Sequence, residues 1–168
     1  GLPCVAMRDS RSKLKLATMV PNKGECEYAI RAAQRDVSRI LGYKKMIFKS
    51  DQEEALKVFL DRVQSGISAQ VIREESPVGE SQSNGDIESA IKVIEGHFRT
   101  TRSNLETNLG IKVGEEHPIW PWMVRHVGMT LFRFDVGPDG RTPYRRLKGK
   151  DFHGKYANFG EQVFYLKP

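Results

Sequence analysis

The sequence predicts a single α/β domain, in which short apolar strands alternate with amphipathic helices. The order strand, helix, strand, helix, strand fills the first half of the chain, and this order is typical of an α/β layer with parallel pairing. Two longer helical patterns follow in the second half. The length of 168 residues corresponds to one domain, which buries roughly 70 % of the surface that its unfolded chain exposes.

The first segment is predicted to be a hairpin followed by a helix. Residues 3–8 and 13–20 are short apolar runs, and the polar residues Asp9–Ser12 between them favour a turn that joins two antiparallel strands. From residue 25 to residue 41 the apolar residues recur at helical spacing, and Gly42 is expected to end this helix.

A unit of strand, helix and strand is predicted next. Residues 45–49 form a compact strand, residues 52–64 place their apolar side chains on one helical face, and residues 69–73 form another short strand. The two strands are expected to lie parallel, because a helix connects them. The polar stretch Ser81–Gly85 is then expected to be a loop that holds an extended substrate near the start of the next helix.

Two long helices are predicted in the second half. Apolar residues recur at helical intervals from Asp86 to about Leu109, which makes this the longest predicted helix. A second apolar helix is expected from about Pro118 to Phe134, and Gly137–Gly140 marks a turn after it.

The end of the chain is predicted to be a basic extension. Residues 141–155 are basic and poor in apolar residues, and a final strand is expected over residues 162–166. We therefore expect a core over residues 1–134 and an extension over residues 135–168.

Composition favours an acidic partner and an intracellular location. The chain carries 27 basic and 21 acidic residues, a formal net charge of +6, and this mild excess favours a polyanion such as a nucleic acid. Cys4 and Cys26 are too few for a disulfide framework, so we expect two reduced, buried thiols. No run approaches the roughly 20 apolar residues of a membrane-spanning helix, so no membrane partner is expected.

Asp51 and Glu88 are the candidate metal-binding residues. Asp51 follows a predicted parallel strand, at the sheet edge where ligands usually bind, and Glu88 opens the longest helix after 36 intervening residues. Hard ions such as Mg²⁺ or Mn²⁺ prefer oxygen ligands, and two ions about 3.5–4 Å apart promote in-line phosphoryl transfer. A two-ion site needs a third carboxylate, which is expected to precede Asp51.

Both carboxylates also have a structural interpretation. Asp51 lies in the stretch Ser50–Glu54, which fits a helix start with a capping box. Glu88, in the first turn of the predicted helix, would be stabilised by the helix dipole by about 0.3–1 kcal/mol. These interpretations stay open beside the metal-binding one.

Around these carboxylates the chain resembles the catalytic core of retroviral and copia-type retrotransposon integrases, which belong to the RNase H-like superfamily. Ser50-Asp51-Gln52 matches the family's second Asp at a strand end, and Ser76 to Glu88 resembles the segment that leads into the family's Glu-bearing helix. Arg141 to Lys150 and Phe159-Gly160-Glu161 resemble the stretch after the core in copia-type polyproteins. The similarity therefore runs along nearly the whole chain.

The resemblance implies an RNase H-like mixed sheet flanked by helices, an Asp, Asp, Glu triad, and Mg²⁺ or Mn²⁺ as the cofactor. Residues 2–20 match the family's second and third strands, so the first, central strand with its catalytic Asp is expected to lie before Gly1. The chain is therefore expected to be incomplete at its N-terminus and inactive by itself. Asp9, in the turn between the two strands, is interpreted as structural.

The resemblance also implies contacts with DNA. Lys92 lies one helical turn beyond Glu88 and matches a DNA-contacting Lys of the family, and an ion pair with Glu88 is an equal alternative. Gln82 and Asn84 fall in the expected substrate loop. Basic residues near the end of the chain are candidates for backbone contacts, which give salt-dependent affinity without sequence specificity. These residues are Arg141, Arg145, Arg146 and Lys148.

Other residues with possible chemistry receive structural interpretations. Trp120 and Trp122 flank a proline near a helix start and are interpreted as packing anchors. The four histidines have no spacing that suggests a metal site or a catalytic triad. Arg99 and Arg102 extend the basic side of the longest helix and are interpreted as a solvated face.

The resulting hypothesis is a metal-dependent polynucleotidyl transferase for DNA integration. It would process the 3′ ends of element DNA and then direct the 3′-hydroxyl to target DNA. The resemblance implies DNA as the partner, a multimer on DNA and a nuclear location. Two alternatives remain: a non-catalytic or repurposed nucleic-acid-binding module, and an RNase H-type nuclease, which fits the fold but not the stretch Thr142–Tyr144.

Overall fold

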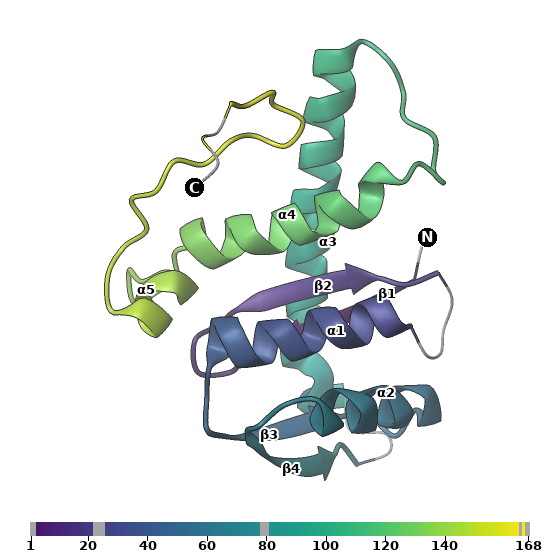
Figure 1. Cartoon of the computed structure of the whole chain (residues 1–168), viewed down its shortest axis with the longest axis vertical. Helices are drawn as coiled ribbons and strands as arrows, with labels where there is room; N and C mark the ends of the chain where they lie inside the picture. The colour runs from purple at the N-terminus through teal and green to yellow at the C-terminus, as the bar shows by residue number, and fades with distance from the viewer. Residues whose placement is uncertain (1–2, 22–25, 78–80, 165, 167–168) are drawn as a thin grey trace. The chain divides into compact units, whose positions relative to one another are not determined.

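The computed structural model describes residues 3–21, 26–77, 81–164 and 166 (Figure 1). The chain divides into two compact units. The first unit comprises residues 1–6 and 18–89, and the second comprises residues 7–17 and 90–168. Helices and short strands alternate in the predicted order, so the α/β class is confirmed.

The first unit is built on a parallel strand pair and two helices. β3 (Lys45–Ser50) and β4 (Gln70–Glu75) pair in parallel over all six residues of each strand. α2 (Glu54–Ser65) connects these strands, and α1 (Glu27–Arg35) packs against α2. The predicted unit of strand, helix and parallel strand is therefore confirmed.

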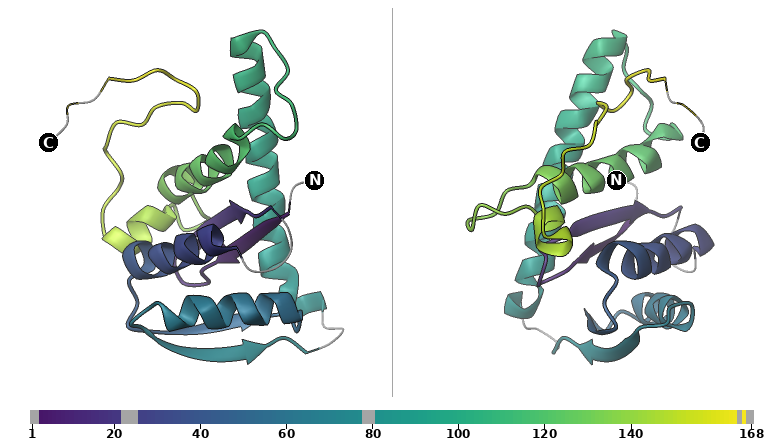
Figure 2. Two further views of the ribbon diagram at one scale, coloured as in Figure 1. Left: turned by 45° about the vertical axis from the view of Figure 1, so that its right-hand side comes forward. Right: turned by 60° about the vertical axis from the view of Figure 1, so that its left-hand side comes forward.

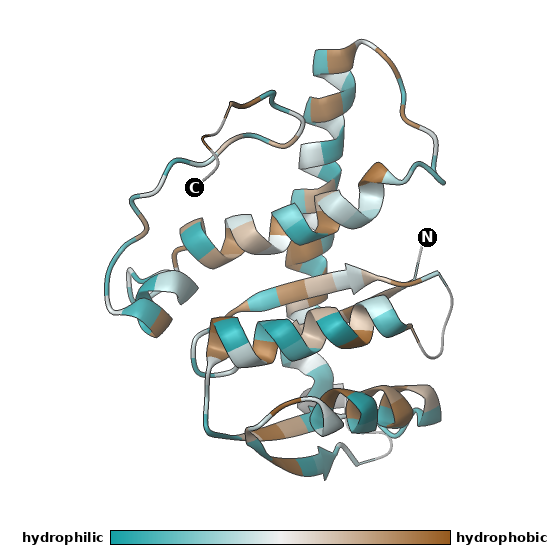
Figure 3. Ribbon diagram, viewed as in Figure 1, coloured by the Kyte–Doolittle hydropathy of each residue, from teal (hydrophilic) through white to brown (hydrophobic). Residues whose placement is uncertain are grey.

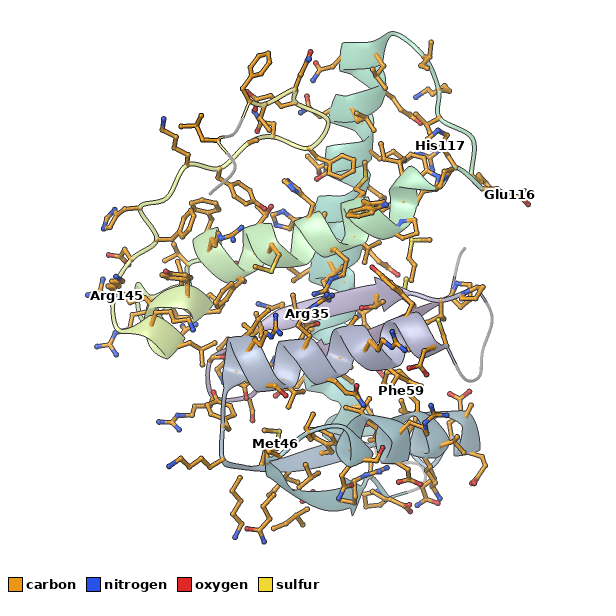
Figure 4. The ribbon with its side chains drawn as sticks, viewed as in Figure 1. Arg35, Met46, Phe59, Glu116, His117 and Arg145 are labelled. Carbon is orange, nitrogen blue, oxygen red and sulfur yellow. The ribbon has the colours of Figure 1, made fainter. Side chains whose placement is uncertain are left out.

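An apolar core holds α1 and α2 together. Phe59 and Val63 of α2 are buried with Ala29 and Ile30 of α1 and with Val20. Figure 4 shows Phe59 in the space between the two helices. Hydrophilic and hydrophobic residues alternate along α1 in Figure 3, which is the pattern of a helix with one buried face. Burial of this face is the main favourable term for docking α1.

The helix that starts as α1 changes its geometry before it ends. Residues Asp36–Leu41 (η1) continue it as a π-helix, and Gly42 follows with a φ of 64°. The Gly42 amide donates a hydrogen bond to the Val37 carbonyl at 2.9 Å. Glycine adopts this left-handed conformation at little cost because it has no Cβ atom. The predicted helix end at Gly42 is confirmed.

β1 (Cys4–Arg8) and β2 (Lys15–Met19) form the predicted hairpin. The carboxylate of Asp9 accepts hydrogen bonds from the backbone N–H of Ser12 at 2.8 Å and from the Ser12 hydroxyl. The Asp9 amide donates to the Leu14 carbonyl at 2.9 Å. These bonds close the turn, so Asp9 has a structural role, as the sequence predicts.

The described strands form two separate sheets, not the one mixed sheet that the resemblance implies. β1 pairs with β2 and β3 pairs with β4, and none of the strands in the described part of the chain joins the two pairs. A single sheet would need a further strand that is hydrogen-bonded to both pairs. The RNase H-like arrangement of the sheet therefore stays a prediction, as does the division at residue 134.

The second unit contains most of α3 (Ser81–Leu109), together with α4 (Ile119–Phe134) and α5 (Pro143–Lys148). α4 is the most apolar of these helices, and α5 packs against it, which is visible in both views of Figure 2. The predicted helix over 118–134 is confirmed. Among the described residues, no helix is long and apolar enough to cross a membrane.

Aromatic side chains attach the segment after α5 to α4. The ring of Tyr156 stacks on His126 of α4 with 5.1 Å between ring centroids, and the Phe152 ring meets Phe134 at 5.8 Å. The guanidinium of Arg133 lies 4.7 Å from the centroid of Phe152. Burial lowers the pKa of His126, and the charge of Arg133 lowers it further. The predicted basic extension therefore includes an apolar attachment to the rest of its unit.

The polar stretch Ser81–Gly85 is helical, so its prediction as a loop was wrong. α3 begins at Ser81, five residues before the predicted start at Asp86. Extension of an existing helix adds one hydrogen bond for each residue that is ordered, which favours helix even for polar residues and for Gly85. Polarity of a short stretch next to a long helix is therefore a weak loop signal.

Two predictions for the end of the chain were also wrong. α5 was not predicted, although Thr142 caps it by accepting a hydrogen bond from the Arg145 amide at 3.1 Å and Gly149 ends it. The predicted strand over 162–166 is absent at the described residues 162–164 and 166, and Phe164 is 96 % exposed. A strand needs a hydrogen-bonding partner, and none of the described residues 162–164 and 166 pairs with a strand.

Three side chains differ from their predicted burial. Cys4 and Cys26 are free cysteines as expected, but Cys4 is exposed and Cys26 is only half-buried. Trp120 is a packing anchor, because it is buried and donates from Nε1 to the Gly114 carbonyl at 2.8 Å. Trp122 is 74 % exposed, so the same prediction was wrong for it.

Candidate functional site

Asp51 lies directly after β3, on the predicted edge of the parallel strand pair. Its Oδ1 atom accepts a hydrogen bond from the Glu53 amide at 3.1 Å, which turns the chain into α2. The side chain is exposed. This bond forms a turn before the helix. The N-cap of α2 is Glu53, which has no side-chain cap hydrogen bond, so the predicted capping box with Ser50 or Asp51 as N-cap was wrong. Oδ2 of Asp51 is not used by this turn.

The ends of β3 and β4 are held close together. The Ser76 amide donates to the Ser50 carbonyl at 2.8 Å, and the Gln52 side-chain amide donates to the Ser76 carbonyl at 3.3 Å. The hydroxyls of Ser50 and Ser76 are buried, and neither has a hydrogen-bond partner among the described residues. The residue directly before Asp51 therefore carries a buried hydroxyl without a described hydrogen-bond partner.

Glu88 is exposed and is the eighth residue of α3. The helix dipole acts mainly within the first turn, so it does not explain this Glu as the sequence analysis suggested. Within the described part of the chain, neither Glu88 nor Lys92 has an ion-pair partner, which removes the alternative of a pair between them. Asn84 is half-buried in α3, and the side chain of Gln82 lies outside the described parts.

Asp51 and Glu88 belong to the same unit. The described residues contain no group of three or more His, Cys, Asp or Glu side chains that could hold a metal ion. A complete two-ion site is therefore not formed by the part of the chain that the structure describes. The roles of Asp51 and Glu88 as metal ligands stay predictions.

A basic cavity of about 790 Å³ lies within the second unit. The β1–β2 hairpin forms one wall, and the segment from Asp135 to Arg146 forms the other. Two of the lining side chains, Asp135 and Asp139, are acidic. Six are basic: Arg8, Arg11, Lys13, Lys15, Arg141 and Arg146.

Ion pairs and hydrogen bonds join the two walls of this cavity. Lys15 Nζ lies 2.6 Å from the Asp135 carboxylate. Arg146 pairs with Asp139 at 2.5 Å and donates from Nη1 to the Ser12 carbonyl at 3.1 Å. The hydrogen bond from Arg146 lowers the pKa of Asp139, so this carboxylate keeps its charge in moderately acidic solution.

The structure separates the predicted DNA-contacting residues of the extension into two groups. Arg141 and Arg146 line the cavity. Arg145 and Lys148 are exposed on α5, and Figure 4 shows Arg145 at its outer side, where it pairs with Asp151 at 3.4 Å.

The four basic residues of the hairpin that line the cavity were not among the predicted binding residues. A usable signal was present in the sequence, because residues 8–15 contain four basic side chains and one acidic side chain. Nothing in the sequence indicated that they would meet a loop more than a hundred residues later.

Comparisons with known proteins identify the fold. No protein-family model matches the sequence, and no curated protein matches it. Among solved structures, the chain is similar to one described as the catalytic core domain of BIV integrase, with a TM-score of 0.55 and 16 % sequence identity. The match covers 86 % of this chain and 84 % of that chain. The protein therefore has an α/β fold similar to that of an integrase catalytic core.

Proposed function

We propose that this protein is the polynucleotidyl transferase core of a copia-type retroelement integrase, with an RNase H-like fold and a nuclear location. The observation that carries the proposal is the fold, which is similar to an integrase catalytic core over 86 % of a chain that also contains the Asp51 and Glu88 motifs. The sequence motifs and the fold are separate observations, and each supports a resemblance to integrase catalytic cores. Function is assigned from the residues of the site, since one fold serves many activities.

Asp51 and Glu88 are the proposed ligands of Mg²⁺ or Mn²⁺. Both are exposed carboxylates of one unit, and Oδ2 of Asp51 is not used by the turn into α2. Two such oxygen donors suit one hard ion that keeps several waters, whereas a second ion would need a further donor. A bound ion would activate a water or a 3′-hydroxyl and stabilise the leaving oxygen.

The proposed partner is DNA, on which the protein would act as a multimer. Lys92 is exposed one turn beyond Glu88 and is not engaged in an ion pair with any described residue, so its charge is available for a phosphate. Asn84 lies one turn before Glu88 on the same helix. The basic residues of the extension would add contacts without sequence preference.

The alternative proposal is a non-catalytic module that binds nucleic acid. The observation in its favour is that no three-ligand cluster occurs among the described residues. In this alternative Asp51 serves only the turn into α2, and the basic side chains still bind the nucleic acid.

The catalytic proposal predicts that Glu88→Gln abolishes strand transfer and spares DNA binding. The assay joins a duplex oligonucleotide with a free 3′-hydroxyl to plasmid DNA in the presence of Mn²⁺ or Mg²⁺. It uses the chain extended by its upstream coding sequence, where the first Asp is expected. We expect transfer to fall on the order of 100-fold or more, because a metal-binding charge is lost. DNA affinity should stay within about twofold, since the change does not remove a basic residue.

Glu95→Gln is the matched control, because Glu95 is also an exposed Glu of α3, and its ion pair with Arg99 is long, at 3.9 Å. It should leave transfer unchanged. Equal transfer by wild type and Glu88→Gln would refute the catalytic assignment. An upstream sequence without an Asp-bearing strand, together with DNA binding and no transfer, would establish the non-catalytic alternative.

A further inference from the structure

We propose that the basic cavity of the second unit is a binding site for the backbone phosphates of a nucleic acid. The site consists of the β1–β2 hairpin and the segment from Asp135 to Arg146, and it contains neither Asp51 nor Glu88, which belong to the first unit. The inference deepens the proposed function, because it rests on the same class of partner.

The charges that line the cavity favour an anion. Six basic and two acidic side chains give a formal excess of four positive charges. Each acid is already paired, Asp135 with Lys15 and Asp139 with Arg146. A concave surface with one sign of charge concentrates its field and raises the local concentration of an oppositely charged ligand.

The framework of the site exists without a ligand. Lys15 and Arg146 each expose only 14 % of their side chains, and their contacts fix the hairpin against the opposite wall. Arg146 reaches both Asp139 and the Ser12 carbonyl, and Ser12 is itself bound to Asp9. Binding therefore does not have to order the two walls, which lowers the entropic cost of association.

The side chains at the rim of the site remain available for phosphate. Lys13 and Arg141 are exposed. Among the described residues, the ammonium of Lys13 donates to the uncharged Ser10 carbonyl at 2.6 Å and has no ion-pair partner, so its charge is not neutralised there. Arg141 uses its backbone N–H to bind Asp139 at 3.1 Å and has no side-chain partner among the described residues. An arginine fork matches the oxygens of a phosphate in two parallel hydrogen bonds.

The lining also argues against an apolar small molecule. Pockets for such ligands are lined mainly by hydrophobic and aromatic side chains. Among the described residues that line the cavity, Val136 and Pro138 are apolar and none carries an aromatic ring on which a base could stack. The site is therefore suited to phosphates and not to bases, and it should bind without sequence preference.

The test compares the salt dependence of DNA binding between two double variants of the same charge. Lys13→Gln with Arg141→Gln removes two cavity charges, and Arg39→Gln with Lys44→Gln removes two exposed charges of the first unit. Affinity for a short DNA duplex is measured over a range of salt concentrations. For the cavity variant, the slope of log affinity against log salt should become shallower by about 1.8, or ~0.9 for each lost phosphate contact. The control variant should keep the wild-type slope.

A second measurement uses the wild-type protein and does not depend on how the variants fold. An amine-acylating reagent is applied with and without DNA, and the modified lysines are identified by mass spectrometry. DNA should protect Lys13 and leave Lys44 unprotected. Equal modification of Lys13 in both conditions, or equal slopes for the two double variants, would overturn the proposal.

The outcomes separate this proposal from the catalytic one. A shallower slope in the cavity variant, together with unchanged transfer by Glu88→Gln, would support the phosphate site and refute the catalytic assignment. Loss of transfer in Glu88→Gln with no change of slope in the cavity variant would refute the phosphate site alone. A wild-type chain without affinity for DNA would refute both.

Discussion

At the scale of single residues, the hairpin turn shows how one short polar stretch carries much of the local structure. Asp9 holds the Ser12 amide and hydroxyl, and the Ser12 carbonyl in turn accepts from Arg146. Ser12 is almost completely buried, and its hydroxyl donates to the Asp9 carboxylate and accepts from the Leu14 amide at 3.3 Å. The turn is therefore part of the wall of the basic cavity and not only a connection between two strands.

Two buried serines with opposite hydrogen bonding give a matched pair of stability predictions. Ser12 is 1 % exposed and bonded to a carboxylate, whereas Ser76 is 2 % exposed and its hydroxyl has no partner among the described residues. Ser12→Ala should destabilise the protein by about 1.5–3 kcal/mol, because a hydrogen bond to a charged group is lost. Ser76→Ala should be neutral or should stabilise by about 1 kcal/mol, because an unpaired buried hydroxyl is removed. Urea unfolding of the three proteins measures both changes. A loss of stability in Ser76→Ala similar to that in Ser12→Ala would contradict the prediction.

The carboxylates of the predicted active site show what residue patterns can and cannot predict. Asp51 lies at the end of a parallel strand, as its sequence context indicated, but it forms a turn before α2 and does not cap that helix, whose N-cap is Glu53. The interpretation of Glu88 depended on the wrong start of α3. Position within a helix depends on where the helix begins, which is the least certain part of a periodic pattern.

At the scale of elements, long periodic patterns predicted the helices well, and short polar or apolar stretches misled. The helices over 54–65 and 119–134 match their predictions closely, since many residues contribute to each pattern. The five polar residues before Asp86 and the apolar run over 162–166 were misassigned. A short segment takes its conformation from its neighbours, and those are set by the tertiary structure.

Two glycines in helical contexts should respond in opposite ways to alanine. Gly42 ends η1 with a φ of 64°, where a Cβ atom is unfavourable, so Gly42→Ala should destabilise by about 1–2 kcal/mol. Gly96 lies inside α3, and a Cβ atom there would have no heavy atom within 4 Å. Gly96→Ala should therefore stabilise by about 0.5–1 kcal/mol, because the unfolded chain loses conformational freedom. Thermal unfolding checks both signs, and a stabilising Gly42→Ala would be inconsistent with the left-handed helix end.

A buried carboxylate connects the end of α3 to the loop that follows it. Glu106 accepts hydrogen bonds from Lys112 at 2.9 Å, from the Val113 amide at 3.1 Å and from Arg102 at 3.1 Å. Arg102, interpreted from sequence as part of a solvated face, is thus engaged inside its unit. These bonds, and the one from Lys112 most of all, lower the pKa of Glu106 from 4.5 to about 2.

This lowered pKa predicts a defined acid sensitivity. The folded protein holds Glu106 ionised at a pH where the unfolded chain binds a proton, so the stabilisation is complete above about pH 4.5 and is lost as the pH falls toward 2. Glu106→Gln should lower the free energy of unfolding at neutral pH. Between pH 4.5 and 2 the free energy of unfolding should also fall less steeply with pH than in the wild type, and the difference in slope should correspond to at most one bound proton. Denaturant titrations over this pH range measure the slope. Glu95→Gln, on an exposed part of the same helix, is the control and should keep the wild-type profile.

At the scale of the whole molecule, net charge predicted the class of partner but not the surface that would bind it. The formal charge of +6 favours a polyanion wherever the basic residues lie. The structure brings the basic residues of a hairpin near the start of the chain together with those of a loop near its end, within one unit. The contacts of Phe152 and Tyr156 with α4 likewise join residues that are separated in the sequence.

The sequence by itself determined the α/β class, the hairpin, the parallel strand pair with its connecting helix, and the extent of α4. Each of these depends on local periodicity and on turn residues, which act over a few neighbouring positions. The tertiary structure alone decided that the strands in the described part of the chain form two sheets, that Trp122 is exposed while Trp120 is buried, and that six basic side chains share one cavity. These features result from contacts between residues that are distant in the chain, because burial and charge pairing depend on what the folded chain brings together.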